Sequence, residues 1–306
     1  MLIDALQKQS GLGRNQLIWF AQTASRRYKV YNIEKQTGGT RRIEHPSRDL
    51  KAIQRWINKF LFRSFPIHEN ATAYKKGASI LKNAERHMKS SFTLRLDFTN
   101  FFPSFSAHAI SQFLNQENVA RELHLTAEDI TFVCNIATRN GNLTVGSPSS
   151  PVITNAMMFE FDNHISDLAQ RNNLVYTRYA DDLFVSAKDA DHLRGMAREI
   201  TNFSLNYNRV RLTINQQKTA YLSRRYRRAI TGLVITPDHK VSIGRDRKRE
   251  IKSLVHKFIR DELELADFPR LRGLIAFAMD SERSFFQSLK RKYGEEVLER
   301  ILGRID

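Results

Sequence analysis

The sequence predicts an α+β fold, in which helices and antiparallel strands are mixed without the regular βαβ repeats of a parallel sheet. In several segments the apolar residues recur every three or four positions, as on the buried face of an amphipathic helix. In residues 92–97 and 174–185, apolar and polar residues alternate instead, as they do in half-buried strands. A chain of 306 residues can bury a substantial core, in one large domain or in two or three smaller subdomains.

The first half of the chain is expected to hold helices on either side of a β-hairpin. Residues 1–27 carry apolar side chains at helical spacing, and so do residues 50–62. Between them, Tyr28–Ile33 and Thr40–Ile43 flank a Gly-Gly pair, which is typical of a hairpin turn. We therefore expect a two-stranded ribbon between two helical segments.

The rest of the chain is expected to add three further helices around the remaining strands. Apolar spacing predicts one helix after Pro103 and another that begins at Pro151 and continues to Leu168. Proline favours the start of a helix because its ring already fixes a helical φ angle. The third helix, over residues 245–260, has a face of lysines and arginines opposite its apolar positions.

Composition points to a polyanionic partner. Lys and Arg number 49 against 32 Asp and Glu, which gives a net charge of +17 and a pI of about 10.1. A surplus of this size favours nucleic acid over a membrane surface. The single cysteine, Cys134, excludes an internal disulfide and a cysteine-based zinc site. No apolar run is long enough for a membrane span and no signal-peptide pattern begins the chain, so we expect a cytoplasmic protein without a membrane partner.

The tetrad Tyr179-Ala180-Asp181-Asp182 is the most informative feature of the chain. It lies between two short apolar runs, which predicts a β-hairpin with both carboxylates at its tip. An Asp-Asp pair alone is most often a solvated turn, but Asp97 lies in a similar setting at the end of another predicted strand. Neighbouring carboxylates repel one another, and Mg²⁺ is the cation best suited to neutralise them. Three converging aspartates can hold two metal ions about 3.5–4 Å apart, as in nucleotidyl transfer.

Six segments occur along the chain in a fixed order. They are Asn83-Ala84-Glu85-Arg86-His87, Leu96-Asp97-Phe98 followed by Phe101-Phe102-Pro103-Ser104, Gly146-Ser147-Pro148-Ser149-Ser150-Pro151, the Tyr179 tetrad, Asn215-Gln216-Gln217-Lys218-Thr219, and Ile230-Thr231-Gly232. Over roughly residues 25–295 the chain thereby resembles bacterial retron reverse transcriptases. The first and last segments fit the Asn-Ala-x-x-His and Val-Thr-Gly motifs that separate retron enzymes from other reverse transcriptases.

The resemblance implies a right-hand polymerase with fingers, a palm and a thumb. It divides the chain into an N-terminal helical segment at 1–27, fingers at 28–90, a palm at 91–235, and a thumb with a C-terminal RNA-binding region at 236–306. Helical insertions are expected within the palm around 105–150. The palm is expected to be an antiparallel sheet that carries the tetrad hairpin, and the thumb is expected to be helical.

The expected metal ligands are Asp97, Asp181 and Asp182, which would hold two Mg²⁺ ions, with Mn²⁺ as the alternative. One ion would activate the primer hydroxyl and the other would hold the triphosphate and the departing pyrophosphate. Tyr179 is expected to pack near the primer end, because an aromatic ring beside the metals offers a stacking face and a phenol.

Five residues are expected at the incoming nucleotide. They are Arg41, Arg42, Phe102, Gly146 and Lys218. Phe102 stands where the resemblance implies the side chain that excludes a ribose 2′-hydroxyl, with packing in a phenylalanine cluster as the alternative. One of the two arginines is expected to bind the triphosphate, because a guanidinium fork suits phosphate oxygens. Lys218 is expected to protonate or neutralise the pyrophosphate, with a plain surface lysine as the alternative.

The loop that carries Gly146 departs from the family pattern in one position. Reverse transcriptases commonly have glutamine before this glycine, and here the residue is Val145. That glutamine offers polar contacts near the nascent base pair, so valine is expected to alter fine selectivity. The metal-binding carboxylates are intact, and we expect an active enzyme.

RNA contacts are expected in four places. Asn83 and His87 lie four positions apart on a predicted helix, where they would contact RNA or brace the fingers, and a structural role is the commoner fate of a lone histidine. Thr231 and Gly232 are expected to touch RNA, or else to permit a turn between palm and thumb. The remaining expected RNA contacts lie on the thumb helix, at Lys248, Lys252 and Lys257, and in an arginine-rich run at 224–228.

The function that the resemblance implies is that of an RNA-directed DNA polymerase of retron type. It would bind its own structured non-coding RNA, start from a guanosine 2′-hydroxyl, and use dNTPs to make multicopy single-stranded DNA (msDNA) that remains attached to the RNA. A host ribonuclease H would remove the template, and a separate effector protein would act with the enzyme in antiphage defence. The alternatives are an intron-type or abortive-infection reverse transcriptase, a nucleic-acid-binding subunit with a vestigial site, and a palm-fold nucleotide cyclase.

Overall fold

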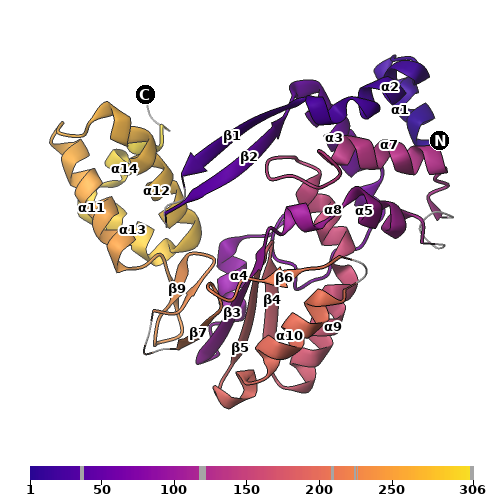
Figure 1. Cartoon of the computed structure of the whole chain (residues 1–306). Helices are drawn as coiled ribbons and strands as arrows, with labels where there is room; N and C mark the ends of the chain where they lie inside the picture. The colour runs from indigo at the N-terminus through magenta and orange to yellow at the C-terminus, as the bar shows by residue number, and fades with distance from the viewer. Residues whose placement is uncertain (35–37, 117–121, 208–209, 224, 226, 304–306) are drawn as a thin grey trace.

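The structure is a computed structural model, and it describes residues 1–34, 38–116, 122–207, 210–223, 225 and 227–303. These residues form a mixed α and β fold, as predicted, with three antiparallel sheets. A long hairpin extends from the N-terminal helices toward the C-terminal helices, and the largest sheet lies below it in the view of Figure 1. Among the described residues no helix combines the length and the apolar composition of a membrane span.

The N-terminal helices pack on helices that come from the middle of the chain. Their bounds are α1 Leu2–Ser10, α2 Arg14–Gln22, η1 Ala24–Arg26, α3 Arg48–Phe60, η2 Phe62–Ser64, α5 Ala107–Leu114 and α7 Ala127–Ala137. The buried Asp129 of α7 accepts the backbone N–H of Ile3 at 2.9 Å and an ion pair from the terminal amine at 3.2 Å. The first helix is therefore fixed to residues more than a hundred positions away.

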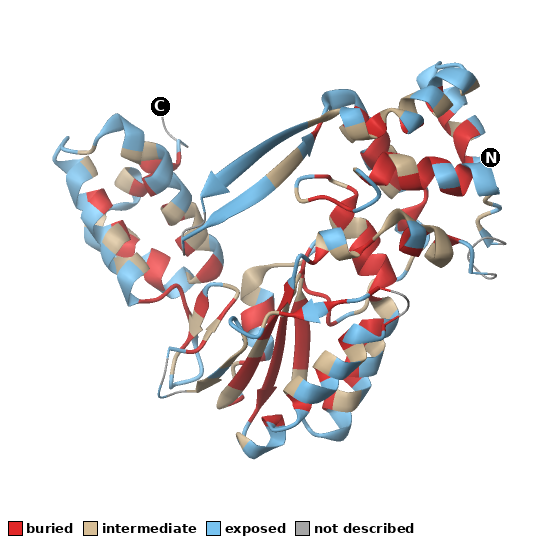
Figure 2. Ribbon diagram, in the orientation of Figure 1, coloured by how far each residue is buried: buried red, intermediate tan, exposed pale blue. Residues whose placement is uncertain are grey.

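The predicted hairpin consists of β1 (Tyr28–Glu34) and β2 (Thr40–Pro46), and their pairing runs from Tyr28 opposite Pro46 to Glu34 opposite Thr40. Gly38 and Gly39 both have positive φ angles, of 87° and 78°, which glycine adopts without steric strain. Most of the ribbon is exposed on both faces (Figure 2). This exposure leaves its side chains available to a partner.

The central sheet has the strand order β4-β5-β3-β6, with β7 also paired to β3. The strands are β3 Phe92–Thr99, β4 Val175–Tyr179, β5 Asp182–Ala187, β6 Thr213–Ile214 and β7 Ala220–Ser223, and the helices around them are α4 Ile80–Arg86, η3 Phe102–Ser104, α8 Ser150–Met157, α9 Phe159–Arg171, η4 Asp191–Leu193 and α10 Met196–Leu205. Helices α9 and α10 cover one face, where apolar side chains of the strands join the main core (Figures 1 and 2).

Two details of this region differ from the sequence-based expectation. The helix expected to begin at Pro151 and continue to Leu168 is two helices, α8 and α9, with Met158 between them. Strand β3 does not end at Asp97 but continues to Thr99, because Phe98 and Thr99 pair with β6. Asp97 therefore lies inside a strand that has neighbours on both sides.

The C-terminal part of the chain forms a separate apolar cluster with its own small sheet. Its elements are β8 Ala229–Ile230, β9 Leu233–Ile235, β10 Val241–Ser242, α11 Arg245–Ile259, η5 Leu265–Asp267, α12 Phe268–Ser281, α13 Arg283–Tyr293 and α14 Glu295–Leu302. Their buried side chains form a cluster that also includes Ala84 of α4 and Phe184 of β5. The helical end of the chain is thus anchored on the central sheet.

Candidate active site

Two of the three predicted carboxylates face each other across the central sheet. Asp97 of β3 pairs directly with Asp182 of β5. Directly opposed residues in an antiparallel pair point to the same face and lie within a few ångströms of each other. Asp181 precedes Asp182 in the turn between β4 and β5, and its carbonyl accepts the Phe98 N–H at 3.0 Å. The fold therefore brings all three aspartates to one end of one sheet.

Strand alternation explains why these side chains are polar in an otherwise apolar sheet. Thr93, Arg95 and Asp97 point to one face of β3, whereas Leu94 and Leu96 point to the face that joins the main core. The polar face continues deeper into the molecule as a cluster of buried hydroxyls. The site lies where this polar face reaches the end of the sheet.

The site carries more negative charge than its surroundings stabilise. Burial, the Asp182 carboxylate and the Asp97 carboxylate together raise the pKa of Asp181. Burial also raises the pKa of Asp182, with a further contribution from Asp97, and Arg95 offsets part of the shift. Raised carboxylate pKa values mean that the ionised forms lack compensating positive charge. A divalent cation would supply that charge.

Two cations of the chain already contact these carboxylates. The Lys218 Nζ lies 2.9 Å and 3.0 Å from the two carboxylate oxygens of Asp97. The Arg95 Nε and Nη2 donate to Asp182 Oδ1 at 3.1 Å and 2.9 Å. Both side chains are substantially exposed, 53% for Lys218 and 40% for Arg95. Ion pairs to exposed side chains contribute little stability and can rearrange.

With the carboxylates held in this way, no three Asp, Glu, His or Cys side chains within the described residues stand close enough together to hold a metal ion. The donor set nevertheless fits a divalent cation, because hard oxygen ligands are what Mg²⁺ and Mn²⁺ prefer. Asp181 has no ion pair among the residues that the structure describes. The Arg95 and Lys218 pairs hold two of the expected ligands at the position where a cation would bind.

A hollow of about 330 Å³ has Phe102, Gly146 and Tyr74 in its wall, and the Tyr74 phenol lies within electrostatic reach of the Asp181 carboxylate. Lys51 and Arg55 of α3 complete part of the same wall and bring positive charge to it. An apolar ring, a glycine and two cations around one hollow suit the sugar and phosphates of a nucleotide. Phe102 is half-buried and also contacts the phenylalanine cluster, with its ring 5.5 Å from that of Phe101. Both roles expected for it are therefore compatible with its position.

Gly146 has a structural requirement that the sequence did not reveal. Its φ is 117°, and a Cβ at this position would lie 3.0 Å from the Glu44 carbonyl oxygen and 3.3 Å from a methyl of Ile43. The preceding Val145 accepts the Glu44 N–H at 2.9 Å. The loop is thus fixed directly against β2, and only glycine fits that approach.

The two arginines of β2 have different surroundings. Arg42 forms an ion pair with Glu44 at 3.0 Å. Burial, followed by the Asp181 carboxylate, raises the pKa of the Tyr74 phenol, and Arg41 acts on it in the opposite direction. Arg41 therefore lies within electrostatic reach of Tyr74, whereas Arg42 is paired with Glu44.

The two segments that distinguish retron enzymes meet in space. The Asn83 amide is 3.5 Å from the Thr231 hydroxyl, which also donates to the Ile80 carbonyl at 3.3 Å. Thr231 and Gly232 form the two-residue turn between β8 and β9, and both have positive φ, of 47° and 82°. This turn type requires such angles, and no atom lies within 4 Å of a Cβ built on Gly232. The geometry favours the turn over direct RNA contact at Gly232.

His87 lies inside the protein under the central sheet. The ring is completely buried, and its two nitrogens contact the hydroxyls of Ser186 and Thr177, both at 2.8 Å. Asn83 is completely buried as well. Of the two roles expected for Asn83 and His87, burial favours bracing the fingers, because neither side chain has a surface that RNA could contact.

The thumb lysines do not share one surface as expected. Lys248 is half-buried, 2.5 Å from Glu282 and with its Nζ 5.1 Å from the centre of the Phe285 ring. Lys252 and Lys257 are exposed on α11. Lys248 therefore stabilises the thumb internally, and only the other two remain available to phosphates.

The arginines of the run at 224–228 also differ in their surroundings, and Arg224 lies outside the described residues. Arg228 is buried and donates to the backbone carbonyls of Ser90 and His87, which ties the β8 segment to the end of α4.

Tyr179 pairs with Asp182 at the end of β4 and packs against the C-terminal apolar cluster. It thus stands beside the carboxylates, where a primer end would lie.

Sequence reasoning missed several groups that belong to this site, among them Lys51 and Arg55 on the wall of the hollow. Arg95 could have been found, because it alternates with Asp97 on the same strand face. Tyr74 follows no recognised motif and has an unusual φ of 56°. The pair Arg178 and Asp162 is fully buried directly behind the tetrad, and no short spacing in the sequence links the two.

Comparison with known proteins agrees with this geometry. Residues 33–258 match the family described as "Reverse transcriptase (RNA-dependent DNA polymerase)". The chain is 39% identical over 280 residues to the Retron Ec83 reverse transcriptase of Escherichia coli, which covers 90% of this chain and 89% of that protein. It is 32% identical to the Retron Ec86 reverse transcriptase of Escherichia coli, over 90% of this chain and 85% of the other.

Among solved structures, apo telomerase from Candida tropicalis is similar, with a TM-score of 0.50 at 12% identity. The match covers 90% of this chain but only 61% of the telomerase chain. At this identity the similarity concerns the fold alone.

Proposed function

The chain belongs to the reverse transcriptase family and within it to the bacterial retron enzymes, and from this premise we propose that it copies its own structured non-coding RNA into msDNA. It is an RNA-directed DNA polymerase. We further propose that synthesis starts from a guanosine 2′-hydroxyl of that RNA and consumes dNTPs. The direct pairing of Asp97 with Asp182 beside Asp181 is the observation that supports the polymerase chemistry, and the similarity to retron enzymes supports the msDNA product and the 2′ start.

Asp97, Asp181 and Asp182 are the residues that would hold two divalent ions, for which we propose Mg²⁺, with Mn²⁺ as the alternative. Such ions, when bound, activate the attacking hydroxyl and stabilise the charge of the departing pyrophosphate. Lys218 would neutralise or protonate the pyrophosphate, and its Nζ, 2.9 Å from Asp97, supports a role close to the carboxylates. Arg95 limits the repulsion between Asp182 and its neighbours.

The hollow of about 330 Å³ supports a role in nucleotide selection. Phe102 on its wall would exclude a ribose 2′-hydroxyl by its bulk. Arg41, Lys51 and Arg55 would bind the triphosphate, because guanidinium and ammonium groups suit phosphate oxygens. Tyr179 would pack at the primer end.

The RNA is proposed to lie along the thumb, on the exposed face of α11. Lys252 and Lys257 would contact its phosphates, and an RNA stem or hybrid would be held there by shape and backbone. We propose the domain limits 28–90 for the fingers, 91–235 for the palm and 236–306 for the thumb, after the helical segment at 1–27. We also propose that the enzyme acts in the cytoplasm, in antiphage defence together with a separate effector protein. A host ribonuclease H would remove the RNA template.

The test is to express the protein together with the DNA that flanks its gene and to isolate the resulting nucleic acid. We expect DNA joined to RNA through a 2′,5′-linkage, which a debranching enzyme shortens to free DNA. Linear complementary DNA that resists debranching would refute the 2′ start and would favour another class of bacterial reverse transcriptase. A complete lack of DNA synthesis on any RNA would favour a nucleic-acid-binding subunit.

A further inference from the structure

Arg178 carries a charge in the interior of the protein, directly behind the Asp181-Asp182 turn. It is the penultimate residue of β4, and its side chain is fully buried. It pairs with Leu183 of β5, so it points to the helix-covered face of the sheet and away from Asp182. A buried guanidinium is costly unless it is paired and hydrogen-bonded, so its contacts account for its presence there.

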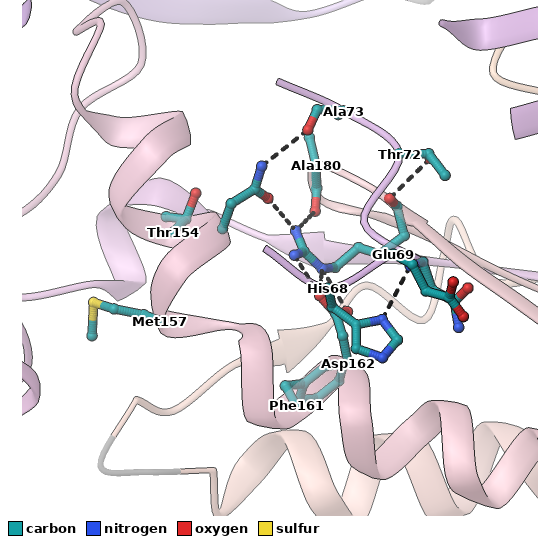
Figure 3. Close-up of polar contacts among 12 residues, drawn as sticks. His68, Glu69, Thr72, Ala73, Thr154, Met157, Phe161, Asp162 and Ala180 are labelled. Atoms are coloured by element: carbon teal, nitrogen blue, oxygen red, sulfur yellow. Dashed lines mark hydrogen bonds and ion pairs between the residues drawn. The ribbon is translucent and has the colours of Figure 1, made fainter. Parts of the chain in front are cut away.

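Asp162 of α9 supplies the pairing charge. The Arg178 Nε donates to Asp162 Oδ1 at 2.9 Å, and Nη2 donates to Oδ2 at 2.7 Å, which is the two-pronged geometry of a strong pair (Figure 3). The Tyr176 hydroxyl donates a further bond to Asp162 at 2.7 Å. These bonds fix the guanidinium and leave its third nitrogen, Nη1, available to donate hydrogen bonds to other groups.

That third nitrogen, Nη1, connects two parts of the active site. It donates to the carbonyl of Ala180 at 3.2 Å and to the side-chain oxygen of Asn155 at 3.2 Å. Ala180 has a φ of 56°, a left-handed conformation that an alanine adopts only when its surroundings impose it. Asn155 in turn donates to the Ala73 carbonyl at 2.9 Å (Figure 3). Ala73 directly precedes Tyr74 in the chain.

The backbone of Arg178 binds the same second segment. Its N–H donates to the Asn70 carbonyl at 2.8 Å, and its own carbonyl accepts the Thr72 N–H at 2.7 Å. One residue therefore holds the turn that presents the carboxylates and the segment that presents Tyr74 to the nucleotide hollow.

We propose that Arg178 is a positioning residue that keeps the carboxylate turn and the Tyr74 wall of the nucleotide hollow in register as one unit. Through the Ala180 carbonyl it sets the direction of Asp181 and Asp182. Through Asn155 it sets the position of Tyr74. This inference rests on the proposed function, because it assigns the two ends of the network to metal and nucleotide.

Two variants test the two ends of the Arg178 network separately, the nucleotide end and the metal end. Asn155→Ala removes the bond to Ala73 and the bond from Arg178 Nη1, but it keeps both charges and the Nη1 bond to Ala180. It should raise the KM for a dNTP about tenfold while Mn²⁺ binding stays unchanged. Arg178→Lys keeps the charge beside Asp162 but loses the fork, and it should weaken Mn²⁺ binding about tenfold. Mn²⁺ binding is measured by electron paramagnetic resonance, which does not require catalysis.

Ser204→Ala is the matched control, because it removes a buried bond of 2.6 Å from the Ser204 hydroxyl to the Ile200 carbonyl, within α10 and outside the Arg178 network. It should lower the melting temperature and leave KM and Mn²⁺ binding at their wild-type values. If Arg178→Lys does not fold, Tyr176→Phe takes its place, with a weakening of Mn²⁺ binding of about threefold expected from the loss of one bond to Asp162.

The proposal is overturned if Asn155→Ala and the Arg178 or Tyr176 variant lower only the melting temperature, as the control does. A wild-type protein that binds Mn²⁺ but extends no primer would refute the proposed function. The Mn²⁺ measurement would still decide the Arg178 assignment in that case.

Discussion

Acid should destabilise this protein through one buried imidazole, that of His87. Burial, followed by the charges of Arg86 and Arg228, lowers its pKa from 6.5 to about 3. The unfolded chain binds a proton below pH 6.5 and the folded chain does not, so stability that is present above pH 6.5 is lost as the pH falls toward 3. At about 1.4 kcal/mol per pH unit, the step from pH 6.5 to pH 5 costs about 2 kcal/mol.

Urea unfolding of wild type and His87→Gln at pH 7 and pH 5 measures this contribution. Glutamine can still bond the Ser186 and Thr177 hydroxyls, so the variant should fold, and titrating carboxylates are common to both proteins. We expect the wild type to lose about 2 kcal/mol more than the variant between the two pH values. His256→Gln, at an exposed position on α11, is the control and should behave as the wild type.

Equal losses in wild type and His87→Gln would refute the reasoning that the ring is buried and neutral. A second measurement distinguishes a structural role of His87 from a direct contact with RNA. At pH 7 the His87→Gln protein should bind its RNA as tightly as the wild type, because the ring has no exposed surface. Weaker RNA binding by a stable variant would restore the contact role.

Three further changes test the nucleotide hollow, the thumb and the turn. Phe102→Ala should raise the kcat/KM of a ribonucleotide relative to its deoxynucleotide by about tenfold or more, whereas an unchanged ratio in a stable variant would assign the ring to the core. Neutralising Lys252 and Lys257 to Gln should reduce the slope of log affinity for RNA against log salt by about 1–2, and an unchanged slope would place the RNA elsewhere. Gly232→Ala should cost about 1 kcal/mol because its φ is 82°. With Thr231→Ala it should lower self-initiated and primer-extended synthesis alike, and selective loss of self-initiation would indicate direct RNA recognition.

Short-range patterns were sufficient to predict much of this molecule. The hairpin around Gly38 and Gly39, the tetrad hairpin and the basic helix α11 all follow from periodicity and turn residues, and the structure contains each of them. The convergence of Asp97 with Asp182 also follows, because strand alternation places both on one face once β3 and β5 pair.

Features that depend on tertiary packing were not predictable in this way. No glycine or proline marks the break at Met158, and the requirement for Gly146 arises from β2, about a hundred positions earlier in the chain. Lys248 and Arg228 look like exposed cations in the sequence, yet Glu282 and backbone carbonyls bind them inside the protein. Tertiary packing determines such contacts, and the charge of a single segment does not reveal them.

We propose that Asp97, Asp181 and Asp182, at the end of one sheet, are the residues on which the RNA-directed DNA polymerase activity of this chain depends. The most direct measurement is the incorporation of labelled dNTP on an RNA template with an annealed DNA primer, by wild type and by Asp181→Asn with Asp182→Asn. We expect extension by the wild type and a loss of at least about a thousandfold in the double variant, because the amides keep the volume but not the charge. The variant should still fold and bind RNA, with a melting temperature at or above that of the wild type, because it removes carboxylates that the fold holds at raised pKa. Extension by the double variant at the wild-type rate would contradict the account.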